Sequence, residues 1–155
     1  RYLTEKLNGY ITGAYIYNKM GLTEQVATTI TIATPNPVRR FRFKNLDIEC
    51  VKAYCMVYPD ESLVPYLRLL DAIKDMKRIP GTTGQDIYNR VKSQYFNGYS
   101  LPELEKIVSL AKSYPPRVRK VVADILGDIR QTVLQTEMAK TILPTTRFNL
   151  DYKTA

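Results

Sequence analysis

The spacing of apolar residues divides the chain into two parts with different periodicities. Before residue 58, short segments alternate apolar and polar residues, whereas residues 58–140 place apolar residues three and four positions apart. We therefore expect an α+β fold, in which a small antiparallel sheet with a short helix is followed by a half made of four α-helices. The expected organisation is a single domain over residues 1–140, with an α/β part at 1–57, a helical part at 58–140 and a tail at 141–155.

The first part predicts a short helix and a strand ahead of a hairpin. TGAYIYNKMG, residues 12–21, has helical spacing between Thr12, a favourable N-cap residue, and Gly21, a residue type that often ends helices. TTITIAT, residues 28–34, alternates β-branched residues and predicts a strand, which Pro35 ends.

Residues 38–54 predict a β-hairpin with Asn45 and Leu46 in a two-residue turn. The cross-strand pairs would then be Lys44–Asp47, Phe43–Ile48, Arg42–Glu49 and Phe41–Cys50. Opposite charges would pair on one face of the hairpin and apolar residues on the other, as in a half-buried antiparallel sheet. Arg39 and Arg40 are left without an obvious partner.

Local signals divide the second part into four helices. The expected helix starts are Ser62, Thr83, Ser100 and Pro115. Glu103 lies three residues after Ser100 and completes a capping box. Short connections predict that neighbouring helices run antiparallel or cross as hairpins. The helical period is lost after Thr141, so the tail is either a last strand or a disordered end.

The last of these helices poses the main question of the sequence. It carries an apolar stripe of Val118, Val121, Val122, Ile125, Leu126, Ile129 and Val133. Its beginning, however, holds Arg117, Arg119 and Lys120, at the end of the helix macrodipole that favours negative charge. Three cations there cost about 0.3–1 kcal/mol of stability each when exposed. Other interactions must offset this cost.

Charge and composition limit the classes of function that the chain can have. The chain has 23 Lys and Arg residues against 15 Asp and Glu, a net charge of +8 that favours an acidic partner such as nucleic acid or an acidic protein surface. It has no histidine and no glycine-rich phosphate loop, which excludes histidine-dependent hydrolase triads and P-loop chemistry. Cys50 and Cys55 are expected to be reduced thiols in a cytoplasmic protein. The sequence contains no membrane-spanning run and no secretory signal.

A metal-dependent nuclease is the enzymatic alternative, because Asp47, Glu49 and Lys52 lie on one predicted strand. Side chains alternate along a strand, so Glu49 and Lys52 would lie on opposite faces. The hairpin also uses both carboxylates in cross-strand pairs. We therefore expect a non-enzymatic protein with no catalytic residues, no metal and no cofactor.

Three separated stretches carry a resemblance to a known family. NGYITGAYIYNKMGLTEQVATTITIAT, residues 8–34, has the pattern Gly-Tyr-apolar-Thr-Gly, a short helix, and then Gly-Leu-Thr-x-Gln. LLDAIKDMKRIPG at 69–81 and SYPPRVRKVVADIL at 113–126 follow in the expected order. In these stretches the chain resembles the AbiEi-like antitoxins and transcriptional regulators of bacterial type IV toxin–antitoxin, or abortive-infection, systems.

The resemblance implies a domain that follows an N-terminal winged helix-turn-helix, which binds operator DNA in such proteins. The domain itself would contribute to repression and to neutralising a nucleotidyltransferase-like toxin, with no membrane partner. The sequence begins at Arg1, where this second domain would begin, as in a truncated or proteolysed product. Operator DNA would then be bound mainly through the missing N-terminal segment. A homodimer is compatible with these expectations.

The candidate nucleic-acid or partner-binding surface consists of Arg39, Arg40, Arg117, Arg119 and Lys120. In the functional account, the three helix cations bind phosphates or acidic groups of a partner at a helix N-terminus. In the structural account, Lys120 pairs with Asp124, Arg119 covers apolar surface with its stem, and Arg117 reaches carboxylates of a neighbouring helix. One basic stripe holding all four arginines would favour DNA. Their dispersal would favour the alternative function, a protein-interaction or dimerisation module with no direct nucleic-acid role.

Overall fold

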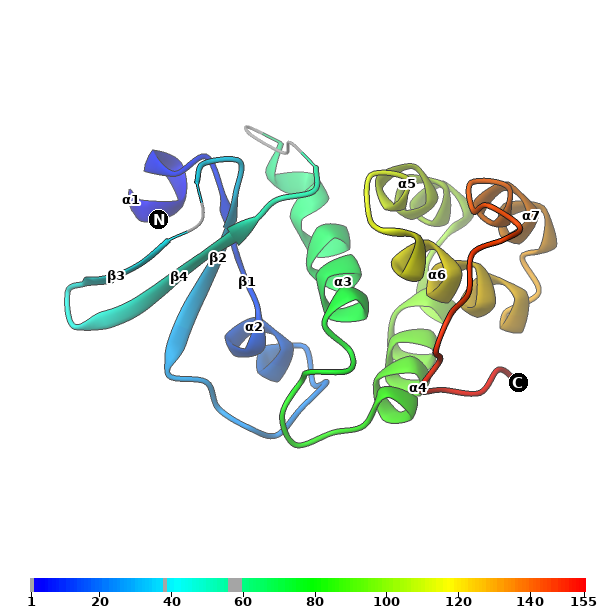
Figure 1. Ribbon diagram of the computed structural model, residues 1–155, viewed down its shortest axis with the longest axis horizontal. Coiled ribbons are helices and arrows are strands. Elements are labelled where there is room, and N and C mark those ends of the chain that lie inside the picture. Colours follow the sequence, from blue (N-terminus) through cyan, green and yellow to red (C-terminus); the bar gives the residue numbers. More distant parts are fainter. Residues whose placement is uncertain (1, 38, 56–59) are drawn as a thin grey trace. The chain divides into compact units, whose positions relative to one another are not determined.

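The computed structural model describes residues 2–37, 39–55 and 60–155 and shows an α+β fold, as the sequence predicts (Figure 1). The chain forms two compact units. The first contains the described residues up to Asp75 together with Ile79–Gly81, and the second contains Met76–Arg78 and Thr82–Ala155. The predicted division at residue 57 therefore differs from the observed one, because the first long helix belongs to the unit that contains the sheet. Within the described residues, no helix is both long and apolar enough to cross a membrane.

The first unit contains a four-stranded sheet. Its strands are β1 (Tyr10–Thr12), β2 (Thr29–Thr34), β3 (Arg40–Phe43) and β4 (Leu46–Lys52), in the spatial order β1-β2-β4-β3. β1 pairs with β2, and β3 with β4, in the antiparallel sense, whereas β2 and β4 are parallel. The sheet is mixed, so the prediction of an antiparallel sheet was wrong. β4 takes the inner position because its Ile48 and Cys50 are buried, which leaves the arginine-bearing β3 at the edge.

The β3–β4 hairpin turns at Lys44 and Asn45, whose positive φ angles of 49° and 65° are those of a tight two-residue hairpin turn. The observed pairs are Phe43–Leu46, Arg42–Asp47, Phe41–Ile48 and Arg40–Glu49. The predicted register was therefore wrong by two residues. A shift of two leaves the side chains of both strands on their predicted faces, so the separation into a charged and an apolar face is confirmed. Lys44, predicted to pair with Asp47, lies in the turn instead.

The two faces of the sheet are covered differently. The face that bears Phe41 and Phe43, called the aromatic face below, holds the buried cluster of Leu7, Ile32, Ile48 and Cys50. Phe41 and Phe43 border this cluster and are only partly buried. The opposite face, called the ion-pair face below, carries the side chains of Arg40 and Arg42 beside those of Asp47 and Glu49.

A buried carboxylate joins the first long helix to the sheet. Asp71, only 3% exposed, accepts hydrogen bonds of 2.7 Å from the hydroxyls of Tyr10 and Thr12 on β1. Nε of Arg68 donates to the carbonyl oxygen of Ile11 at 2.8 Å. These bonds satisfy buried polar groups on both elements, and they explain why this helix belongs to the sheet-containing unit.

In the first unit the short helix after Thr12 and the first long helix begin near the expected positions, whereas the helix at the start of the chain was not predicted. They are α1 (Tyr2–Lys6), α2 (Ala14–Lys19), the 3₁₀ helix η1 (Glu61–Leu63) and α3 (Val64–Lys74). α2 begins after Gly13 without a side-chain cap, so the prediction of Thr12 as its cap was wrong. Asp60, rather than Ser62, supplies the capping carboxylate ahead of α3, by accepting from the backbone N–H of Ser62 at 3.0 Å.

The second unit is helical. Its elements are α4 (Gly84–Gln94), the 3₁₀ helix η2 (Phe96–Gly98), α5 (Leu101–Ala111), α6 (Pro116–Asp128) and α7 (Thr132–Ala139). Thr83 caps α4 by accepting from the backbone N–H of Asp86. Ser100 and Glu103 form the complete capping box predicted for α5.

The expected last helix is divided into α6 and α7. The chain turns at Arg130, which has a φ of 64°, and α7 follows from Thr132. Val133, predicted to continue the apolar stripe, is 80% exposed. The side-chain amide of Gln135 on α7 lies over Gly127 of α6, with its nitrogen 2.5 Å from the position that a Cβ would take.

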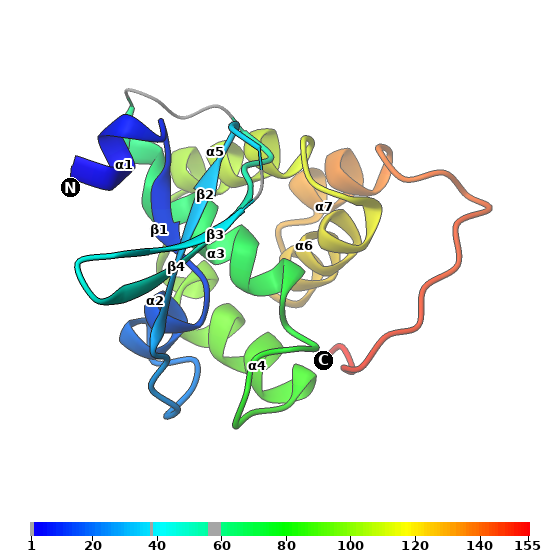
Figure 2. The same ribbon diagram turned by 60° about the vertical axis from the view of Figure 1, so that its left-hand side comes forward.

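The tail after α7 contains no helix or strand, so a last strand is excluded. Its final residues return to the helices of the second unit, as the red end of the ribbon shows (Figures 1 and 2). Tyr152 is only 6% exposed, which means that this end of the chain is packed rather than detached.

Candidate nucleic-acid interface

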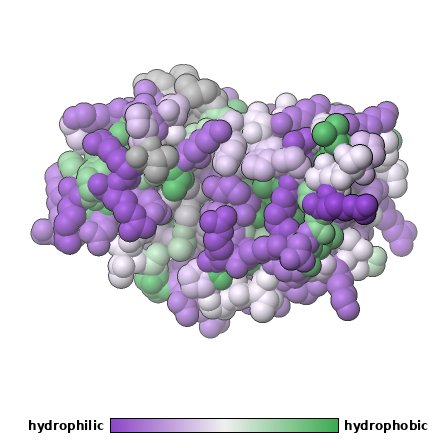
Figure 3. All heavy atoms as spheres, viewed as in Figure 1, coloured by the Kyte–Doolittle hydropathy of each residue, from purple (hydrophilic) through white to green (hydrophobic). Residues whose placement is uncertain are grey.

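The structure divides the five predicted cations between the two units. Arg39 and Arg40 lie at the start of β3 in the first unit, whereas Arg117, Arg119 and Lys120 lie near the start of α6 in the second. Hydrophilic side chains cover most of the surface visible in Figure 3. The two groups of cations differ in the acceptors that surround them.

The cations of the ion-pair face have carboxylate partners. Nη2 of Arg40 lies 2.5 Å from Oε2 of Glu49, and Nη1 of Arg42 lies 3.4 Å from Oδ1 of Asp47. The side chains of Arg40 and Arg42 are 76% and 67% exposed, so these pairs contribute little stability, but they neutralise the face locally. The predicted register placed Glu49 opposite Arg42, so sequence reasoning missed the partner of Arg40.

The cations beside the aromatic face lie over rings. The guanidinium carbon of Arg39 is 4.6 Å from the ring centroid of Phe41, and Nζ of Lys44 is 5.4 Å from that of Phe43. Within the described residues, no carboxylate lies within 4.0 Å of the charged nitrogens of either cation. Burial raises the pKa of the Cys50 thiol, and the nearby Arg39 guanidinium partly offsets this effect.

An exposed aromatic residue extends this surface. The ring of Tyr2 stacks on that of Phe43, with centroids 6.0 Å apart, and Nζ of Lys6 lies 5.6 Å from the Tyr2 centroid. Each of the three cations Lys6, Arg39 and Lys44 thus lies against an aromatic ring, a contact that is favourable without neutralising the charge. We call these three residues the aromatic-face cations.

The cations of α6 are bound within the second unit. Nη2 of Arg117 lies 2.7 Å from Oδ1 of Asp151, and Nζ of Lys120 lies 3.0 Å from Oδ1 of Asp124. The Lys120–Asp124 pair confirms that part of the structural account. The carboxylate that Arg117 reaches belongs to the tail, however, and the prediction of a carboxylate on a neighbouring helix was wrong.

Arg119 was expected to cover apolar surface with its stem, and the structure shows two backbone acceptors for its guanidinium. Its Nε donates to the carbonyl oxygen of Tyr114 at 3.1 Å, and its Nη1 donates to that of Thr141. Orphan carbonyls at helix ends are favourable partners for a cation. These contacts offset the unfavourable macrodipole interaction at the start of α6.

The residues that carry the family resemblance have structural roles here. A Cβ on Gly9 would lie 2.3 Å from the carbonyl oxygen of Ala33, so only glycine fits at that position. Gly13 has a φ of 78°. Tyr10 and Thr12 bind the buried Asp71.

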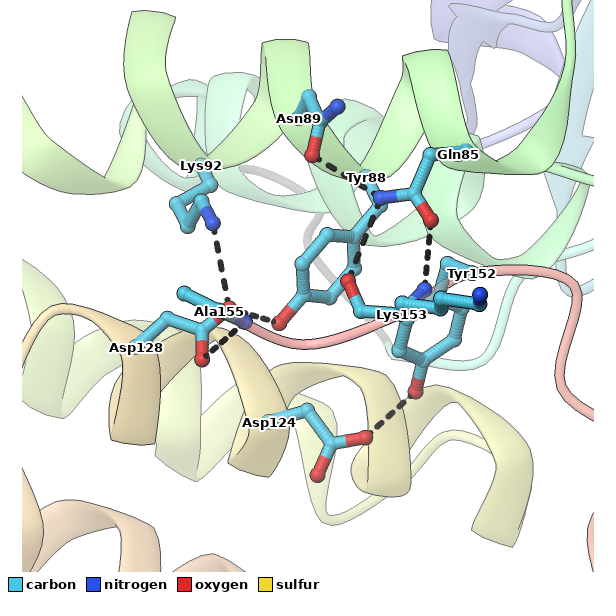
Figure 4. A network of polar contacts seen from close by, with 9 residues as sticks. All are labelled: Gln85, Tyr88, Asn89, Lys92, Asp124, Asp128, Tyr152, Lys153 and Ala155. Atoms are coloured by element: carbon cyan, nitrogen blue, oxygen red, sulfur yellow. Dashed lines mark hydrogen bonds and ion pairs between the residues drawn. The ribbon is translucent and has the colours of Figure 1, made fainter.

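The second unit contains a polar network that sequence reasoning did not find (Figure 4). Asp128 accepts hydrogen bonds from the hydroxyl of Tyr88 at 2.6 Å and from Nζ of Lys92 at 3.2 Å. Burial raises the pKa of the Asp128 carboxyl, but hydrogen bonds from Tyr88, from the backbone N–H of Ala155 and from Lys92 outweigh burial and lower it overall. Burial and the adjacent Asp128 raise the pKa of Tyr88, so its hydroxyl is a neutral donor.

Within the described part of the chain, no three His, Cys, Asp or Glu side chains lie close enough together to hold a metal ion. Asp47 and Glu49 point to the ion-pair face, and Nζ of Lys52 lies 4.9 Å from the ring centroid of Tyr54.

Comparisons of the chain with models of protein families, with curated proteins and with solved structures found no match.

Proposed function

We propose that the chain is a cytoplasmic, non-enzymatic domain of an AbiEi-like antitoxin and transcriptional regulator, which contributes to DNA binding and to toxin neutralisation. Within this function, the aromatic-face cations contact the DNA backbone. The observation that carries the proposal is that Arg39 and Lys44 are exposed cations with no carboxylate partner among the described residues. The resemblance of residues 8–34 and 113–126 to the family supports the identity of the domain.

The expected DNA binding is weak and depends strongly on salt. Each cation that contacts a phosphate releases a condensed counterion, so three contacts give a slope of roughly −3 in log affinity against log salt concentration. The cations of α6 contribute little in this proposal, because Asp151, Asp124 and backbone carbonyls already bind them.

The test compares two charge-matched double variants by fluorescence anisotropy with double-stranded DNA at about 25–200 mM salt. Arg39→Gln/Lys44→Gln should weaken binding and reduce the salt slope by about 2, because each lost phosphate contact removes about 1 from the slope. Arg40→Gln/Arg42→Gln changes the net charge equally but removes paired cations, so its slope should change by less. Equal effects of the two variants would show that only net charge matters. No binding by the unmodified chain at low salt would exclude the DNA role of this domain.

The alternative function, a protein-interaction module, is favoured by the apolar residues beside the same cations. Tyr2 and Leu46 are 61% and 48% exposed, and Phe43 is only partly buried. An aromatic and apolar patch with cations around it is typical of protein interfaces. In that function, Leu46→Lys abolishes co-purification with a nucleotidyltransferase-like partner and leaves DNA affinity unchanged or higher. Retained co-purification would contradict it.

A further inference from the structure

Side chains of two helices hold the end of the chain in the second unit. They are Gln85 and Tyr88 on α4 and Arg117, Asp124 and Asp128 on α6, called the tail site below. Figure 4 shows most of this site, with the tail running past the ends of these side chains. The tail site contacts both the side chains and the backbone of the segment that it binds.

Two side chains of the tail are recognised individually. The ring of Tyr152 stacks on that of Tyr88, with centroids 4.3 Å apart and planes inclined by 10°. The Tyr152 hydroxyl donates to Oδ2 of Asp124 at 2.7 Å. The neighbouring carboxylate of Asp151 forms the ion pair with Arg117. A buried aromatic ring beside an ion pair with arginine is typical of the hot spots that supply most of the binding energy in an interface.

The backbone of the tail is recognised as well. Gln85 accepts from the N–H of Lys153 at 2.6 Å and donates to the carbonyl oxygen of the same residue at 3.3 Å. Both carboxylate oxygens of Asp128 accept from the N–H of Ala155 at 3.1 Å. Side chains that satisfy the backbone of an irregular segment in this way are characteristic of peptide-binding sites, because an extended peptide presents the same groups.

The first part of the tail, residues 141–148, makes fewer contacts with the helices than residues 149–155 and is called the joining segment below. Residues 141–148 contain no helix or strand, and Leu143 is 71% exposed. Arg119 binds the carbonyl oxygen of Thr141 at the start of this segment. The hydrogen bonds that its backbone N–H groups donate to other backbone groups are short-range, such as that from Thr146 to the carbonyl oxygen of Leu143 at 3.0 Å. The joining segment therefore has the character of a hinge between the helices and a specifically bound peptide.

We propose that the tail site binds residues 149–155 of a second copy of this chain, so that two copies exchange tails and form a dimer. Every contact described above would recur between copies without any new interface, which is the energetic basis of domain swapping. The tethered tail has a high effective concentration at its own site. The exchanged dimer therefore becomes populated when a chain cannot close on its own tail, or at high protein concentration.

Charge reversal of the Arg117–Asp151 pair tests the exchange in full-length chains. Arg117→Glu and Asp151→Arg each place like charges together within one copy. In an equimolar mixture of the two variants, opposite charges meet only between copies. The mixture, at about 0.1–1 mM, should elute at twice the mass of the 17.8 kDa chain, while each variant alone stays monomeric.

The double variant Arg117→Glu/Asp151→Arg is the matched control, because it restores opposite charges within one copy and should be monomeric. A mixture of single variants that remains monomeric at these concentrations would overturn the proposal. If a single variant fails to fold, binding of a labelled synthetic peptide of residues 149–155 to the unmodified chain, at up to about 1 mM peptide so that it competes with the tethered tail, replaces the mixture. Peptide binding at least tenfold weaker after Tyr152→Ala in the peptide is expected, and no binding of the unmodified peptide would contradict the proposal.

Discussion

The β3–β4 hairpin and the start of α6 both carry several cations, but the two regions differ in how many of these cations have an acceptor. At the hairpin, Arg40 and Arg42 have cross-strand carboxylates, whereas Arg39 and Lys44 keep their charge over aromatic rings. At α6, every one of the three cations binds a carboxylate or backbone carbonyls of the same unit. Local charge density therefore does not identify a binding surface. What matters is whether the fold brings acceptors from elsewhere in the chain.

The largest expected effect tests whether the tail is part of the second unit. Tyr152→Ala removes a ring that is 94% buried and stacked on Tyr88, so it should lower the free energy of unfolding by about 2–4 kcal/mol. Tyr2→Ala is the matched control, because Tyr2 is mostly exposed, and it should cost less than about 1 kcal/mol. Urea titration followed by far-UV circular dichroism measures both. Equal costs would show that the tail contributes nothing special to stability.

The intermediate expected effect compares the loss of one cation in each of the two regions. Arg117→Gln leaves the Asp151 carboxylate without its charged donor, whereas the carbonyl oxygen of Asn149 keeps Nζ of Lys77 at 2.6 Å. The variant should therefore destabilise the chain by about 0.5–1.5 kcal/mol. Arg39→Gln removes no ion pair seen among the described residues, so it should change stability by less than about 0.5 kcal/mol.

A double-mutant cycle identifies the source of that difference. Arg117→Gln and Asp151→Asn should be non-additive by about 0.5 kcal/mol or more, since they remove the same contact. Additive costs, or a larger cost for Arg39→Gln than for Arg117→Gln, would reverse the contrast between the two regions.

The fold followed from the sequence where the signals are local. The capping box at Ser100 and Glu103, the cap at Thr83 and the strand over residues 28–34 depend on residues within a few positions of one another. The faces of the hairpin were predictable for the same reason, since alternation survives a register shift of two. The register itself was not, because Lys44 and Asn45 had to be recognised as residues that adopt positive φ.

The candidate site was less predictable, because the acceptors that bind its cations come from residues far away in the sequence. Asp151 is 34 positions from Arg117, and Thr141 is 22 positions from Arg119. Neither acceptor lies in a periodic segment, so no pattern indicated that the tail returns to α6. The alternation of β3 did separate Arg39 from Arg40, and that signal could have distinguished an available cation from a paired one.

The smallest expected effect is a pH dependence in the second unit. The Asp128 carboxyl has a lowered pKa in the folded chain, so the folded state holds it ionised at pH values where the unfolded chain, with a pKa near about 3.9, begins to protonate it. Its contribution to stability is therefore complete above that value and is lost as pH falls through the folded pKa.

The stability difference between the unmodified chain and Asp128→Asn should accordingly shrink by less than about 1 kcal/mol between pH 6 and pH 3. Tyr88→Phe removes the shortest hydrogen bond to this carboxylate and leaves those from Lys92 and from the N–H of Ala155, so the same comparison in that background should depend less on pH. A stability difference that stays constant with pH in the unmodified background would mean that Tyr88, Lys92 and the tail do not hold the Asp128 charge. In that case the contrast with the hairpin would rest on the cations of α6 alone.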